Sequence, residues 1–128
     1  MFDLVADVEH YREFLPWCSD SRLVSRSDDR LCGWIEVSRL GIRQAFTTCN
    51  TLEPPERMGI ELAEGPFKRL HGEWCFIPLR EDACKVTLTL EFEFSGRLID
   101  AAFGKVFHQV ANSLVESFVA RAREVYRA

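Results

Sequence analysis

The feature that most constrains this fold is a change of hydrophobic period at Ser95-Gly96. In residues 85–94, just before it, apolar side chains occupy every second position, which is typical of a strand with one buried face. In residues 98–126, just after it, apolar side chains recur at three- and four-residue steps, which predicts one helix of about 29 residues. The apolar arc of that helix is wider than one partner helix would need. We therefore expect a sheet to pack against it.

The same periods assign faces to both elements. In the strand we expect one row to face the helix, consisting of Val86, Leu88, Leu90, Phe92 and Phe94. The opposite row is polar: Lys85, Thr87, Thr89, Glu91 and Glu93. The apolar side of the helix is predicted to hold Ile99, Phe103, Val106, Phe107, Val110, Leu114, Phe118 and Val125. Its wet side is predicted to hold Lys105, His108, Gln109, Asn112, Glu116, Arg123 and Glu124.

Five more strand-like stretches come earlier in the chain, at residues 22–27, 31–39, 42–52, 58–62 and 67–79. Their connections are short, so neighbouring strands should pair as antiparallel hairpins. Residues 1–15 have helical spacing up to Pro16, although the polar segment 7–10 could divide them into two short helices. These elements predict a single α+β domain over residues 1–128, with a curved antiparallel sheet wrapped around the C-terminal helix. Glycines at 33, 41, 59 and 72 are expected to ease the curvature.

Composition excludes several classes of function. The net charge is −4 with both signs interspersed, which argues against binding to DNA. The five cysteines form no C-x-x-C pair and are odd in number, so we expect reduced, structural thiols. No apolar run approaches the ~20 residues that span a bilayer, and the start lacks a signal-peptide pattern. The expected compartment is the cytoplasm.

The predicted architecture allows two alternatives for the space between sheet and helix. A sheet that curves around a helix often leaves a gap, here lined by Phe, Trp, Leu and Val, and such an apolar cavity would suit a hydrophobic ligand. The alternative is a filled core, because sheet-on-helix packing normally reaches crystal-like density. Periodicity alone leaves both open.

Several motifs carry a resemblance to a known family. They are Phe14-Leu15-Pro16-Trp17-Cys18, Phe46-Thr47-Thr48, Gly65-Pro66-Phe67-Lys68-Arg69-Leu70, Trp74-Cys75-Phe76 and the run 91–107. With them the chain resembles the coenzyme Q-binding family of the START-like, helix-grip (polyketide cyclase, SRPBCC) superfamily. That family also includes bacterial ribosome-association toxins called RatA. The resemblance covers nearly the whole chain.

The resemblance implies a helix-grip fold that binds ubiquinone or another polyprenyl quinone without transforming it, in support of respiration and with no other cofactor. It also implies an alternative, a toxin that binds the large ribosomal subunit and blocks subunit association. A peripheral contact with the inner membrane stays open. We expect the ligand to be lined by Trp17, Phe46, Phe67, Leu70, Trp74, Phe92, Phe103, Gly104, Phe107 and Val110.

The chain departs from the family at its start. Family members usually have a strand before the first helix, whereas this sequence begins at Met1-Phe2 within that helix, through misassignment or truncation. We therefore expect one sheet edge to be open, or covered by another copy of the chain.

Two of the expected ligand residues have a second interpretation. Trp17 is either a gate or membrane anchor at the mouth of the cavity, or a cap on the core. Gly104 either leaves room for a ligand beside Phe103 and Phe107, or packs closely on a strand.

Little in the sequence indicates catalysis. No phosphate loop, nucleophile elbow or zinc-type cluster is present, and the three histidines are expected to face solvent on separate elements. Polar residues in phase with inward apolar neighbours are Arg39, Gln44, Thr48 and Asn50. We expect these to contact a ligand head group or to lie near strand ends, and we predict that the protein is not an enzyme.

Overall fold

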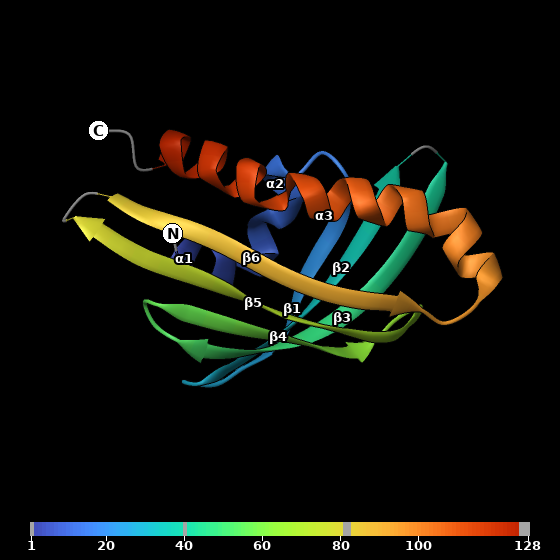
Figure 1. The fold of residues 1–128 in the computed structure, drawn as a ribbon, viewed down its shortest axis with the longest axis horizontal. Helices are drawn as coiled ribbons and strands as arrows, with labels where there is room; N and C mark the ends of the chain where they lie inside the picture. The colour runs from blue at the N-terminus through green and yellow to red at the C-terminus, as the bar shows by residue number, and fades with distance from the viewer. Residues whose placement is uncertain (1, 40, 81–82, 126–128) are drawn as a thin grey trace.

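The computed structural model describes residues 2–39, 41–80 and 83–125. Three short helical segments open the chain: α1 (Phe2–Ala6), the 3-10 turn η1 (Val8–His10) and α2 (Tyr11–Phe14). Six strands follow: β1 (Cys18–Arg26), β2 (Arg30–Arg39), β3 (Ile42–Glu53), β4 (Arg57–Glu64), β5 (Phe67–Arg80) and β6 (Ala83–Phe94). The long helix α3 (Arg97–Val125) completes the fold. Figure 1 shows α3 lying across the concave side of the curved sheet.

The sheet is antiparallel throughout and runs in chain order from β1 to β6, which confirms the predicted hairpins. One position shows why a glycine is needed. A Cβ at Gly72 in β5 would collide with the backbone carbonyl of Thr89 in β6, so only glycine permits this close approach of the two strands.

The predicted register of β6 is confirmed. Val86, Leu88, Leu90, Phe92 and Phe94 all pack against the core, while the side chains of Glu91 and Glu93 are 60% and 48% exposed. A slip of one residue would have exchanged the two rows, so the buried apolar face is what selects this register.

The predicted helix is confirmed apart from its ends. α3 begins at Arg97, and the predicted last residue, Tyr126, lies outside the described residues. Every residue assigned to its wet side is exposed. The assignment of Val125 to the buried face was wrong, since Val125 is 48% exposed. The last turn of a helix has packing partners only on its N-terminal side, and here Phe118 is the last fully buried residue.

The N-terminal segment is broken into short pieces, as the alternative interpretation expected. Asp7 has φ −88° and ψ 66°, which lies outside the helical region and separates α1 from η1. β1 begins at Cys18, four residues before the predicted start at Arg22. The polar stretch that was missed is held by backbone pairing with β2, as at Cys18↔Val37, and not by an apolar pattern.

The expectation that all five cysteines are reduced was wrong. Cys32 and Cys49 form a disulfide, and Cys18, Cys75 and Cys84 are free. The two bonded residues are direct partners in the β2–β3 register, with their Cα atoms 4.0 Å apart. Cysteines 17 residues apart in sequence carry no local signal of pairing, because the register of the hairpin brings them together.

Candidate ligand-binding site

A cluster of phenylalanines joins the sheet to α3 near the start of the helix. Its centre is Phe107, which is 3% exposed. The centroid of its ring lies within 6.0 Å of five other rings, those of Phe46, Phe67, Phe92, Phe94 and Phe103. Most of these pairs meet edge to face, the arrangement that aromatic quadrupoles favour. Residues from β3, β5, β6 and α3 therefore share one aromatic core.

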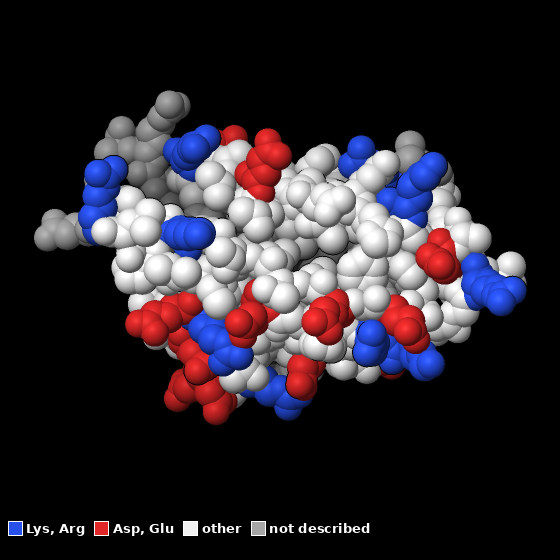
Figure 2. Space-filling model, viewed as in Figure 1, with Lys and Arg blue, Asp and Glu red and all other residues white. Residues whose placement is uncertain are grey.

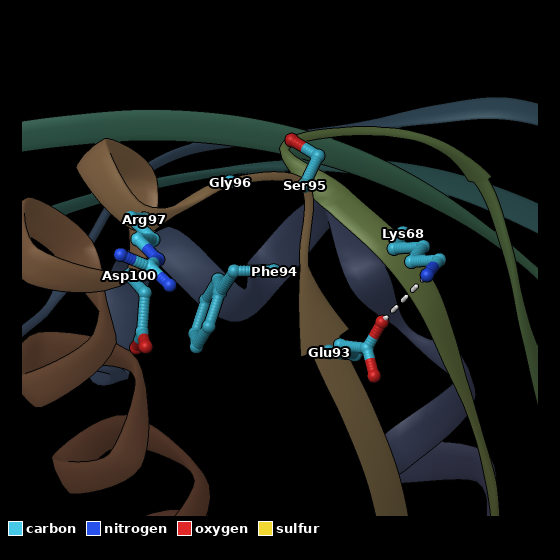
Figure 3. A pocket seen from close by; sticks show the side chains of 7 residues that line it. All are labelled: Lys68, Glu93, Phe94, Ser95, Gly96, Arg97 and Asp100. Atoms are coloured by element: carbon cyan, nitrogen blue, oxygen red, sulfur yellow. Dashed lines mark ion pairs between the residues drawn. The ribbon is translucent and has the colours of Figure 1, made fainter.

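This core is open to solvent on one side, along a groove between β6 and α3. Two clefts form the groove, of about 570 Å³ and about 530 Å³. Phe94 lines both clefts, and Leu90 and Phe92 line the second. In Figure 3 the ring of Phe94 projects from the end of β6 toward Arg97 and Asp100 of α3. The groove thus has an aromatic floor that remains half-exposed.

Charged side chains of both signs surround this floor. On the sheet side, Lys68 pairs with Glu93 at 3.4 Å and His71 pairs with Glu91 at 3.3 Å. On the helix side, the ring of His108 lies over Phe92 with their centroids 5.0 Å apart. Figure 2 shows an uncharged surface where α3 meets β6 in the middle of the view, with charged residues around its margins. An amphipathic molecule would match such a surface, with its apolar part on the phenylalanines and its polar part at the rim.

The ten residues expected to line a ligand do not all meet in one place. Phe92 borders the groove directly, and Phe46, Phe67, Phe103 and Phe107 lie beneath its floor as part of the aromatic core. Leu70 and Val110 are buried at 4% and 2% exposure.

Two tryptophans lie apart from the groove. Trp74 stacks on Phe76 and meets Phe118 edge to face, farther along α3. Trp17 is 3% exposed, and this burial favours the cap on the core over a membrane anchor.

Gly104 is buried beside the groove. A Cβ at this position would lie 2.5 Å from Oδ1 of Asp100 and 3.6 Å from the ring edge of Phe94. A side chain here would therefore displace the Asp100 carboxylate on the same helix, whereas its contact with Phe94 of β6 would be an ordinary one. That a ligand uses this space stays a prediction.

Sequence reasoning omitted most of the residues that border the groove, and four of them illustrate why: Lys68, Phe94, Asp100 and His108. Phe94 had a signal, since its inward phase in β6 was evident. The other three are charged or polar residues on exposed faces. Only the tertiary structure shows that these faces form a rim.

Among the described residues, three buried side-chain polar atoms lack a hydrogen-bond partner: Nε1 of Trp17, Oδ1 of Asn50 and Nε of Arg121. Asn50 was predicted to point inward, and its amide nitrogen lies 3.5 Å from the sulfur of Met58. Arg39, predicted in the same phase, is exposed at the end of β2.

Two buried groups on the N-terminal side have raised pKa values. Burial raises the pKa of the Cys18 thiol to about 11, and burial also raises the pKa of Tyr11. The Tyr11 hydroxyl donates a hydrogen bond to the carbonyl of Val5. Both groups are neutral at pH 7, so neither is prepared to act as a nucleophile. Among the described residues, no three His, Cys, Asp or Glu side chains gather as a metal site requires.

Comparison with known proteins fits this architecture. Residues 1–119 match the family described as polyketide cyclase / dehydrase and lipid transport. The chain belongs to this family. Its fold is that of the Zhui aromatase/cyclase from Streptomyces sp. R1128, with a TM-score of 0.80 at 17% identity over 99% of this chain and 87% of that one. None of the described helices is long and apolar enough to cross a membrane.

Two curated relatives represent the two functions implied by the resemblance. The ribosome association toxin RatA of Vibrio cholerae is 48% identical over 98% of this chain and 88% of its own length. The mitochondrial coenzyme Q-binding protein COQ10 homolog B of Xenopus laevis is 27% identical over 98% of this chain and 53% of its own length. Similarity to the toxin is therefore the greater.

Proposed function

We propose that this protein associates with the ribosome, as a RatA-type toxin that binds the large subunit and blocks subunit association. The observation that carries the proposal is the 48% identity to the Vibrio cholerae RatA over nearly the whole chain. This reverses the order suggested by the motifs alone, which placed quinone binding first. A protein acting on ribosomal subunits works in the cytoplasm, the compartment expected from the sequence.

Sucrose-gradient sedimentation tests this function. Purified protein would be mixed with large subunits, with small subunits and with both together. We expect the protein to sediment with the large subunit and to reduce the fraction of joined ribosomes. The salt concentration would be varied, because contacts to ribosomal RNA weaken as salt rises. If the protein stays at the top of every gradient and subunit joining is unchanged, the proposal is wrong.

A second proposal is that the groove between β6 and α3 binds a hydrophobic molecule, such as ubiquinone or a similar polyprenyl quinone. The half-exposed floor of Phe92 and Phe94 supports it, because an apolar surface of this kind gains free energy when covered, at ~25 cal/mol per Å². No reacting side chain is required, so the proposed role is binding without catalysis.

Mass spectrometry of lipids extracted from the purified protein tests the second proposal. We expect an isoprenoid or other long apolar molecule at near-equal molar amount. The Phe92→Ser variant, which makes the floor polar, should retain less of it than a Leu98→Ser control, because Leu98 is 86% exposed outside the groove. Equal retention by both variants would contradict the placement of the ligand.

A further inference from the structure

The disulfide between Cys32 and Cys49 joins two strands that are already paired along their length. The two residues are direct partners in β2 and β3, with their Cα atoms 4.0 Å apart. The ladder between these strands includes every residue of β2, from Arg30 to Arg39, without interruption. β1 and β4 pair with the outer sides of the two strands. Strand pairing therefore keeps the two sulfur atoms adjacent whether or not the bond between them is formed.

The bond lies on the convex face of the sheet. Leu31 in β2 and Leu52 in β3 point into the core and are at most 5% exposed. Side chains alternate between the two faces of a strand, so Cys32 and Cys49 point to the opposite, convex face. Cys32 is 8% exposed and Cys49 is half-buried. Cys49 is therefore the more accessible of the two to a small thiol in solution.

The surroundings of the bond allow it to open without damage to the core. Neither cysteine belongs to the cluster of buried side chains that joins the sheet to α3. The residue paired with Cys32 in β1 is Ser25, and the residue paired with Cys49 in β4 is Glu61. Two thiols in place of the disulfide would thus face small or polar neighbours and would leave no cavity in the core.

The bond does restrain the part of β2 that supports the N-terminal segment. Gly33 follows Cys32 directly, and a Cβ at Gly33 would lie 2.9 Å from Cγ2 of Val8 in η1. Only glycine therefore lets η1 pack this closely on β2. A covalent link from Cys32 to β3 holds the strand at this contact, whereas two thiols leave it held by backbone pairing alone.

The compartment determines what such a bond does. Disulfides are rare in the cytoplasm, and those present are usually catalytic or redox-sensing. Exposed disulfides are also the more readily reduced ones. The free Cys18 does not compete for the partners, because burial raises the pKa of its thiol to about 11 and keeps it protonated.

We propose that Cys32 and Cys49 form a reversible redox switch, which a small disulfide such as glutathione disulfide closes and excess glutathione opens. The closed state is the disulfide of this structure, and the open state is a folded dithiol in which β2 and β3 stay paired. The inference takes only the cytoplasmic compartment from the proposed function.

Both steps of closure are thiol–disulfide exchanges. The thiolate of Cys49 attacks one sulfur of glutathione disulfide, which forms a mixed disulfide and releases one glutathione. The thiolate of Cys32 then attacks the sulfur of Cys49 and releases the second glutathione. Two electrons pass from the cysteines to glutathione disulfide, and the two thiol protons end on the released glutathiones. Excess glutathione drives the same steps in reverse.

Titration with glutathione tests the switch in a Cys75→Ser, Cys84→Ser background, which removes the other two accessible thiols. The protein would be equilibrated at varied ratios of glutathione to its disulfide, quenched with acid and labelled with a maleimide after denaturation. We expect intact mass spectrometry to show one label, on Cys18, in the closed state and three labels in the open state. The transition should fall at an excess of glutathione over its disulfide, as in a reducing cytoplasm.

Two single variants in the same background test the order of the steps. Cys32→Ser removes the thiol that resolves the mixed disulfide, so glutathione disulfide should leave one glutathione attached to Cys49. Cys49→Ser is the matched control and should react at least tenfold more slowly, because Cys32 is the more buried residue. Equal rates in the two variants would contradict the assignment of Cys49 as the residue attacked first.

Circular dichroism distinguishes a switch from a permanent structural bond. Reduction should lower the melting temperature by roughly 5–15 °C and preserve the folded spectrum at 25 °C. A bond that stays closed at every glutathione ratio, thiols that never close, or a chain that unfolds on reduction would each overturn the proposal. None of these measurements involves ribosomes, so failure of the switch and failure of ribosome association are separate results.

Discussion

Replacement of Phe107 by alanine should produce a large loss of stability. The ring is 3% exposed and has five aromatic neighbours within 6.0 Å, from three strands and α3 itself. Truncation of a buried phenylalanine costs about 3–5 kcal/mol through lost transfer free energy and the cavity that remains. The alanine variant also loses the favourable edge-to-face contacts with the neighbouring rings. We therefore expect the free energy of unfolding to fall by about 4–5 kcal/mol.

Urea denaturation followed by circular dichroism would measure this loss. The midpoint should fall while the m-value stays unchanged, since the area exposed on unfolding is nearly the same. Leu98→Ala is the control on the same helix, because a side chain 86% exposed should change stability by less than about 0.5 kcal/mol. A loss below about 2 kcal/mol for Phe107→Ala would refute the reasoning, because it would mean that the cluster collapses into the space or already contains a gap.

Three further predictions concern single sites. Gly104→Leu should keep the fold but reduce the retention of any extracted apolar ligand. Gly104→Ala mainly displaces the flexible Asp100 carboxylate and should reduce retention less. Equal retention by both variants and the unaltered protein would exclude the space beside Gly104 as part of the binding site. Replacing Cys32 and Cys49 together by serine should lower stability by about 3 kcal/mol, because the disulfide closes a loop of 17-residue separation and so restricts the unfolded chain. A melting temperature that reduction leaves unchanged would contradict this prediction. The pKa of Cys18 is raised to about 11 in the folded chain, so the protonated thiol contributes its full stabilisation at pH values below the pKa of the unfolded chain and loses it as pH rises toward 11. Cys18→Ala should remove this part of the loss of stability at alkaline pH. The same pH-dependent loss in the variant and in the unaltered protein would disprove the prediction.

Much of the fold could be predicted from the sequence, because the signals are local. Alternation in β6 and the 3.6-residue period of α3 each report which side of an element is buried, and a single stretch of sequence is enough to read them. The short connections then imply antiparallel neighbours. The start of β1 was missed because its polar residues are held by pairing with β2, a contact that leaves no mark in the local pattern.

The candidate site could be predicted only in part. The aromatic residues Phe46, Phe67, Phe92, Phe103 and Phe107 were identified by phase and motif, and they do come together. The fact that these side chains all point inward did not show whether they enclose a cavity or fill it. That depends on the fit of side chains from four elements, which no one segment encodes.

The sequence by itself determined which residues face inward, since a hydrophobic period is a property of neighbouring positions. Only the tertiary structure decided which residues far apart in the sequence come into contact. The pairing of Cys32 with Cys49 follows from strand register, and the groove between β6 and α3 follows from how the helix packs on the sheet. The physical reason is that burial of a face is a local requirement, whereas the partner that buries it is chosen by the packing of the whole chain.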